Sequence, residues 1–204
     1  MASILKTRVF PGAADAVARS ESSSDLAESI AVQTIESPVG PLTAGIAGDA
    51  VCLLEYRRAC LADQIGSLER QLRRECVTRR VPLHDRLERE LDDYFQGRST
   101  RFGLPLLYPG TPFQERVWSA LLRIPYGSTW SYERLAVEIG NPDAQRAVGT
   151  ANGRNRISIL IPCHRVINKS GALGGYGGGL ERKQMLLELE ARTVRSAADL
   201  LPPP

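Results

Sequence analysis

The sequence predicts an α+β protein made of a small N-terminal antiparallel sheet with helices and a mostly helical C-terminal unit. Two observations lead to this fold class. Apolar and polar residues alternate in short runs before residue 57, which is typical of strands, and apolar residues recur at helical spacing after residue 60. The chain has 204 residues, of which 43% are hydrophobic, so it is long and apolar enough to bury a core.

The N-terminal unit is predicted to occupy residues 30–104, after a tail at 1–29 that is small, polar and aperiodic. Strands are expected at 30–36, 42–46 and 51–56. Short turns separate them, so they should form an antiparallel meander. Leucine-rich helices should follow at 61–72 and 83–95, the second stopped by Gly97.

The C-terminal unit is predicted at 105–192, with a second tail at 193–204. Thr111-Pro112 is a cap and first-turn proline for a helix, and Ser131 caps another over 132–139. Gly140-Asn141-Pro142 ends that helix and a further helix runs over 143–152, before a last one over 180–191. Two short helices joined by a tight turn, the second one basic, have the outline of a helix-turn-helix.

Positive charge is concentrated in one segment. Between residues 143 and 169 the only acidic residue is Asp143, against five basic ones: Arg146, Arg154, Arg156, Arg165 and Lys169. Such clustering is expected of a surface that meets phosphates. No run of 18 apolar residues and no signal-peptide core is present, which favours an intracellular protein, cytoplasmic or in a eukaryote nuclear, without a membrane partner.

A metal site is not expected. Cys52, Cys60, Cys76 and His84 have the right number of ligands for zinc but lack the closely spaced pairs that zinc modules use. We therefore interpret them as small buried side chains and a surface histidine.

The strongest chemical signal is Pro162-Cys163-His164. A buried β-like run over 157–161 ends at the proline, so Cys163 stands where regular structure stops. A nucleophilic cysteine needs a lowered pKa, for which His164, Arg165 and Arg154 are the local candidates. Because neighbours in extended chain point to opposite faces, a water is the expected relay between the thiol and the imidazole. An acid after the site, Glu181, Glu188 or Glu190, would orient the histidine.

The segment Ile159-Leu160-Ile161-Pro162-Cys163-His164-Arg165-Val166, preceded by Asn155, resembles the active-site signature of the O6-alkylguanine-DNA alkyltransferases, the methylated-DNA–protein-cysteine methyltransferases. The agreement covers 111–191 and includes Pro125-Tyr126-Gly127, Arg146-Ala147-Val148-Gly149 and Gly178-Gly179-Leu180. The resemblance implies a winged helix-turn-helix-like DNA-binding motif. It also implies a suicide reaction in which a base is flipped from the duplex through minor-groove binding and its O6-alkyl group passes irreversibly to a cysteine.

The resemblance assigns catalytic roles to four residues. Cys163 is the acceptor, His164 takes its proton through a water, Glu190 orients His164, and Asn155 fixes the active-site turn. The partner is double-stranded DNA containing O6-alkylguanine, the protein acts as a monomer, and no cofactor is implied.

The same resemblance assigns Tyr132, Arg146, Ser131 and Asn141 to DNA binding, with Arg146 filling the vacated base stack. Tyr176, Gly177 and Val166 would bound the alkyl pocket. Arg165 is expected to anchor the turn through an ion pair. Arg156 stands where many relatives have proline, which predicts a looser turn and a more basic site.

Two other functions remain possible at this point. One is a damage-recognition module that binds DNA without transferring the group, and the other is a Cys-His hydrolase, which the basic helix-turn-helix disfavours. The preferred alkyl size and any reaction with O4-alkylthymine stay open.

Overall fold

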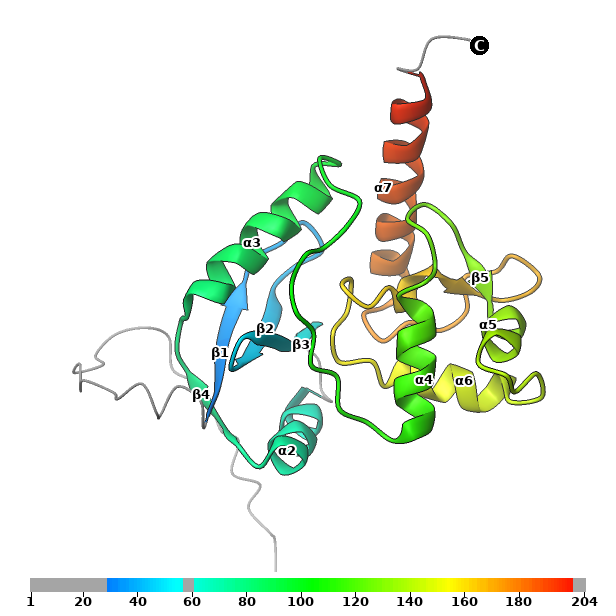
Figure 1. Cartoon of the computed structure of the whole chain (residues 1–204). Coiled ribbons are helices and arrows are strands. Elements are labelled where there is room, and N and C mark those ends of the chain that lie inside the picture. Colours follow the sequence, from blue (N-terminus) through cyan, green and yellow to red (C-terminus); the bar gives the residue numbers. More distant parts are fainter. Residues whose placement is uncertain (1–28, 57–60, 200–204) are drawn as a thin grey trace, which may run out of the picture.

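The computed structural model describes residues 29–56 and 61–199 and confirms the α+β fold class (Figure 1). The tail predicted at 1–29 and Cys60 lie outside the described residues, apart from Ser29, which begins the first strand. Within the described ranges, no helix has the length and apolar character needed to cross a membrane.

The N-terminal sheet contains the predicted meander and one further strand. Strands β1 (Ser29–Ile35), β2 (Leu42–Ala47) and β3 (Ala50–Tyr56) pair antiparallel. The strand β4 (Glu75–Thr78) then adds parallel to β1, giving the order β3-β2-β1-β4. The predicted antiparallel sheet is therefore mixed. The four-residue strand was missed because its exposed ends leave almost no alternation to recognise.

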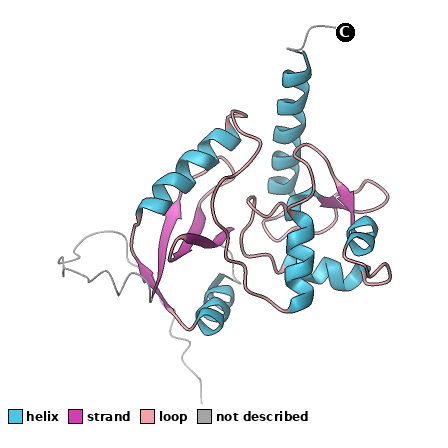
Figure 2. Ribbon diagram, in the orientation of Figure 1, coloured by secondary structure: helices cyan, strands magenta, loops and turns pink. Residues whose placement is uncertain are grey.

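The two helices of this unit cover opposite faces of the sheet (Figure 2). Ile30 and Val32 pack with Leu68 of α2 (Leu61–Leu72). Ala31 and Ile35, on the other face, share a core with Leu87 and the rest of α3 (Pro82–Phe95). The period of two in β1 thus separates two apolar clusters, as a strand buried on both faces requires.

The expectation of a surface histidine at position 84 is wrong. His84 is fully buried, and its Nδ1 accepts a hydrogen bond from the Val81 amide at 3.1 Å. This contact satisfies a free amide at the start of α3, so the histidine serves as a helix cap. Cys52 is buried and Cys76 half-buried, and no group of three potential metal ligands occurs among the described residues.

The C-terminal unit is built from helices. Helix α4 (Pro112–Leu121) starts at Thr111, whose side chain accepts from the Gln114 amide. Helices α5 (Tyr132–Glu138) and α6 (Gln145–Gly153) form the predicted pair. The short strands β5 (Trp130–Ser131) and β6 (Val166–Ile167) pair in parallel. The last helix, α7 (Leu180–Asp199), continues beyond residue 191, so the predicted end of this helix was placed too early.

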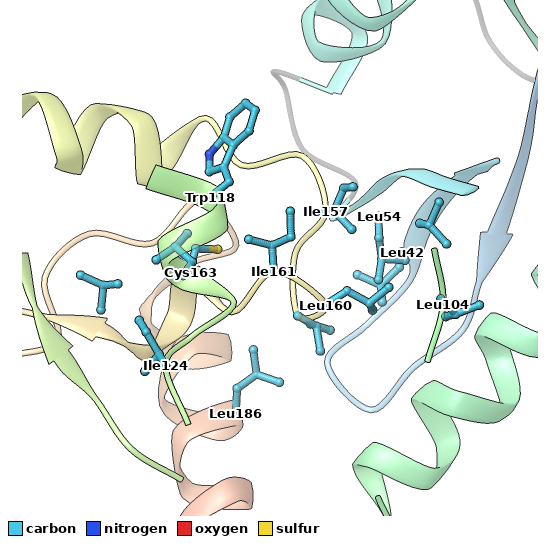
Figure 3. Close-up of a cluster of buried hydrophobic side chains, with 14 of the residues drawn as sticks. Leu42, Leu54, Leu104, Trp118, Ile124, Ile157, Leu160, Ile161, Cys163 and Leu186 are labelled. Atoms are coloured by element: carbon cyan, nitrogen blue, oxygen red, sulfur yellow. The ribbon is translucent and has the colours of Figure 1, made fainter. Parts of the chain in front are cut away.

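One apolar core joins the two units (Figure 3). Leu42 and Leu54 from the sheet, Trp118 from α4 and Leu186 from α7 all belong to one cluster of buried side chains. The backbone continues this contact, since the Leu54 amide donates to the Arg156 carbonyl at 2.8 Å. The N-terminal unit is therefore packed directly against the segment that leads to Cys163.

That segment is not the β-like run that the sequence predicted. Only Ile157 pairs with a strand, through a single bridge to Leu54, and residues 158–160 form turns. Ile159 has a φ of 72°, a left-handed conformation that is unfavourable for a β-branched residue. Its side chain is buried in the core, and burial of this kind holds the strained turn in place.

Candidate active site and DNA-binding face

Cys163 begins a single turn of 3₁₀ helix, η1 (Cys163–Arg165), directly after Pro162. The residue is only 4% exposed, yet it lines a cavity of about 450 Å³. Gly149 and Asn152 of α6 line the same cavity, so the sulfur is reached from the side of the second helix of the helix-turn-helix. This is the opening that nucleophilic chemistry on an external group requires.

The thiol itself does not have the lowered pKa that the sequence analysis expected. Burial raises the pKa of Cys163 to about 11, although the hydrogen bond from Asn155 lowers it. Arg165 is paired with Glu190, and Arg154 is exposed at the end of α6. Neither guanidinium therefore stabilises a preformed thiolate at Cys163. A thiol with this pKa needs a nearby base to act as a nucleophile.

Asn155 is placed to fix the turn, as expected. Its side-chain amide Nδ2 donates to the Ile161 carbonyl at 2.9 Å and contacts the Cys163 sulfur at 3.1 Å. Its Oδ1 accepts from the Ile157 amide at 3.0 Å. One buried side chain thus ties both ends of the strained turn to the Cys163 sulfur.

His164 and Glu190 form the predicted pair. Nε2 of His164 lies 2.8 Å from Oε1 of Glu190, and both side chains are fully buried. Burial lowers the pKa of His164 while the Glu190 contact raises it, and the net direction is down, so the imidazole is neutral at pH 7. Because Nε2–H donates to the carboxylate, Nδ1 carries the free lone pair, and it has no hydrogen-bond partner within the described part of the chain.

Glu190 also confirms the expected role of Arg165. The guanidinium donates from Nε to Oε2 at 2.9 Å and from Nη2 to Oε1 at 2.9 Å, while Nη1 donates to the Ile124 carbonyl. Tyr94 of α3 adds its hydroxyl at 2.8 Å. Burial alone would raise the pKa of Glu190, but the bonds from His164 and Arg165 lower it to about 2. The carboxylate is therefore a fixed anion that joins η1, α7 and the N-terminal unit.

The expected DNA-binding residues lie on the two short helices or directly beside their ends. The ring of Tyr132, at the start of α5, lines the Cys163 cavity, and its hydroxyl contacts the Gly175 carbonyl at 3.4 Å. Ser131 caps α5 through the Arg134 amide, and Asn141 is exposed in the turn before α6. Arg146 is exposed on α6 and lines a neighbouring pocket that shares Tyr132 and Gly149 with the Cys163 cavity.

The basic cluster is smaller than the sequence count suggested. Arg156 and Arg165 point into the protein, and Lys169 pairs with Glu133 at 2.9 Å. Arg146 and Arg154 have no ion-pair partner among the residues described. These two guanidiniums are the members of the cluster that remain available to phosphates.

The expected pocket residues divide into two groups. Tyr176 and Gly177 line the cavity from the glycine-rich loop before α7, with the Tyr176 hydroxyl 3.1 Å from that of Tyr56. Gly178 is required there, because a Cβ at this position would lie 2.4 Å from the Tyr56 ring. Val166 is different, since it is buried in β6 and its side chain does not line the cavity. Strand pairing with Trp130 turns it into the core.

Known proteins resemble this chain over most of its length. Residues 112–192 match the family model described as 6-O-methylguanine DNA methyltransferase, DNA binding domain. The methylated-DNA–protein-cysteine methyltransferase of Mycobacterium tuberculosis is 47% identical over 171 residues, covering 82% of this chain and 95% of the relative. The chain belongs to the methylated-DNA–protein-cysteine methyltransferase family.

Two further similarities agree with membership of this methyltransferase family. The constitutive Bacillus subtilis methylated-DNA–protein-cysteine methyltransferase is 40% identical over 158 residues, covering 77% of this chain and 93% of the relative. A crystal structure of Mycobacterium tuberculosis OGT in complex with DNA has a TM-score of 0.68 and 43% identity, covering 79% of this chain and 93% of that one.

Three buried residues at or near the cavity had no role in the sequence analysis. Glu55 of β3 and Ser158 line the cavity, and Lys183 of α7 is fully buried while donating to the carbonyls of Val166 and Leu173. The sequence did contain a signal that Glu55 has a special environment, because it is an acidic residue in an otherwise apolar strand. Nothing local indicated the other two, because their partners are distant in sequence.

The prediction of a looser turn at Arg156 is wrong. Its guanidinium donates to the Gln71 side chain at 2.9 Å and to the Pro109 carbonyl at 3.1 Å. These bonds fasten the active-site turn to α2 and to the connector between the two units. Burial lowers the pKa of Arg156, and the charge is directed away from the cavity that Cys163 lines.

Proposed function

We propose that this protein repairs DNA by transferring the alkyl group of O6-alkylguanine to Cys163 in a single, irreversible event. The observation that carries the proposal is a buried thiol that opens onto a cavity beside α6, with a neutral His164 adjacent in sequence and bonded to a fixed carboxylate. A family member with a helix-turn-helix beside such a thiol is suited to act on a base in a duplex.

The reaction balances within the site. The sulfur of Cys163 bonds to the alkyl carbon as the O6–carbon bond breaks, and that electron pair remains on O6. The thiol proton passes through a water to Nδ1 of His164, and the resulting imidazolium is stabilised by Glu190. The departing guanine takes up one proton, so overall the thiol proton is exchanged for the alkyl group and a thioether remains.

Binding would place the target base in the cavity. Removing a base from the stack costs a few kcal/mol, and least for a damaged base. Arg146, exposed beside the cavity, would enter the vacated stack, and Tyr132 would contact the flipped base and its flanking phosphate. Ser131 and Asn141, at the two ends of α5, would contact the backbone. Contacts of this kind bind without reading sequence.

Mass spectrometry tests this function. Incubation with duplex DNA containing O6-methylguanine should add one methyl group, about 14 Da, to the peptide that contains Cys163, as nucleophilic thiol chemistry requires. Cys163→Ala should bind the same duplex and gain no mass. An unmodified wild-type protein that retains DNA affinity would instead identify a damage-recognition module.

A further inference from the structure

Glu55 is a buried acid at the catalytic cavity for which the proposed reaction has no use. It lies in β3, whose other residues are almost all apolar, and it is fully buried. Its Oε1 accepts from the Ser158 hydroxyl at 3.0 Å and from the Tyr56 amide at 3.1 Å, and its Oε2 accepts from Gln64 at 3.3 Å. Hydrogen bonds from several elements therefore hold the carboxylate in one orientation.

The cavity has two chemically different sides. Tyr132, Gly149 and Asn152 line it from the helix-turn-helix, the side from which a flipped base would enter. Glu55 comes from the N-terminal sheet, and Ser158 comes from the strained turn that packs on that sheet. A base that enters from the α6 side would thus share one cavity with the Cys163 sulfur and with Glu55.

The negative charge of Glu55 reaches this space. Burial is the main cause of the raised pKa of Cys163, and the Glu55 charge adds to it, as it also does for Tyr176. Lys183 acts in the opposite direction at Cys163, but its ammonium is bonded to the Val166 and Leu173 carbonyls, and it does not line the cavity. Among the described lining residues, Glu55 is the one with a carboxyl side chain.

We propose that Glu55, supported by Ser158, is a specificity-determining residue that selects O6-alkyl groups by their charge. The inference rests on the proposed function and identifies its substrate class. Neutral or ammonium-bearing alkyl groups are accepted, whereas a carboxylate-bearing group such as carboxymethyl is disfavoured. Two like charges in a poorly hydrated pocket repel strongly, and a pocket acid that accepts hydrogen bonds favours a donor over an anion.

Matched substrates test the proposal in the wild-type protein. Single-turnover rate constants are measured on one duplex carrying O6-carboxymethylguanine or its neutral isostere O6-carbamoylmethylguanine. Each rate constant is divided by the rate constant for the reaction of the same modified base with a small free thiolate. This division corrects for the intrinsic reactivity of the alkyl group. The anion should then react at least about tenfold more slowly than the amide, the effect of a like-charge contact. Equal corrected rates would overturn the proposal.

A variant assigns the selection to Glu55. In Glu55→Gln the ratio of the corrected carboxymethyl rate to the corrected carbamoylmethyl rate should rise at least about fivefold toward one. The glutamine side chain keeps the shape of the glutamate and removes its charge. An unchanged ratio in a folded variant would refute the role of Glu55. O6-methylguanine is the reference in both proteins: if the wild type does not transfer methyl, the proposed function fails, and if it transfers methyl without discriminating charge, only this inference fails.

A second wild-type measurement covers the case in which Glu55→Gln does not fold. O6-(2-aminoethyl)guanine should react at least about threefold faster than O6-(2-hydroxyethyl)guanine after the same correction, because an anionic wall attracts an ammonium group. Corrected rates that favour the hydroxyl compound would show that the cavity is not anionic and would overturn the proposal.

Discussion

Replacing Glu190 by glutamine removes one charge from the centre of the active site. The carboxylate is fully buried and accepts hydrogen bonds from His164, from Arg165, from the Tyr94 hydroxyl and from the Gly127 amide. Glutamine has the same shape but only one acceptor oxygen, and its amide group adds donors where donors already converge. The buried guanidinium of Arg165 therefore loses its counter-ion.

The size of the effect follows from the pKa of Glu190. Burial raises the pKa of this carboxyl, but the hydrogen bonds and charges of His164 and Arg165 lower it by more. The resulting pKa is about 2, against an ordinary value of 4.5. At about 1.4 kcal/mol per pKa unit, the anion contributes about 3 kcal/mol to the unfolding free energy at pH 7. The range for breaking a buried ion pair, about 3–5 kcal/mol, agrees.

Urea unfolding of the wild type and Glu190→Gln measures this difference. It should be about 3 kcal/mol at pH 7 and should shrink as the pH falls below 4.5 toward 2, because the depressed pKa gives stability that is lost on protonation. Methyl transfer should slow by about 10²-fold or more, since His164 loses the anion that stabilises its protonated form.

The exposed Glu188 on the same helix supplies the control, because it bonds only to Gln184 at 2.8 Å among the described residues. Glu188→Gln should cost less than about 0.5 kcal/mol, as surface substitutions do. If Glu190→Gln unfolds with the same free energy and the same pH dependence as Glu188→Gln, the buried network does not stabilise the protein as described.

Arg146, His164 and Lys183 can each be tested separately. Arg146→Ala should slow repair of duplex DNA by about tenfold while leaving the reaction with the free O6-methylguanine base nearly unchanged, since only the duplex needs its stack refilled; equal losses on both substrates would remove that role. Because burial lowers the pKa of His164, the transfer rate measured against pH should fall only below 6.5, and an apparent pKa above 6.5 would contradict a neutral buried imidazole. Lys183→Met leaves the Val166 and Leu173 carbonyls without their donor and should lower the unfolding free energy by about 1–3 kcal/mol in urea, whereas Lys183→Arg should recover part of the loss.

Local patterns predicted what depends on neighbours in sequence. The three meander strands and the helices α2 and α3 were predicted to within a residue or two, because period, caps and turn residues are local signals. The extent of α7 was not, since residues 193–199 have few apolar side chains to mark a helix. The strand β4 was missed because its pairing with β1 is a long-range contact.

The order of the residues around Cys163 determined by itself the proposed acceptor, the proposed adjacent base and the family resemblance, since the signature is one continuous segment. Only the tertiary structure decided the protonation state of the thiol, because a pKa depends on burial and on groups that the fold brings close. It also decided that Arg156 faces inward and that Glu55 lies at the cavity, although 103 positions separate Glu55 from Ser158. Electrostatics acts through space rather than along the chain, so no local pattern could reveal the charge that the alkyl group would meet.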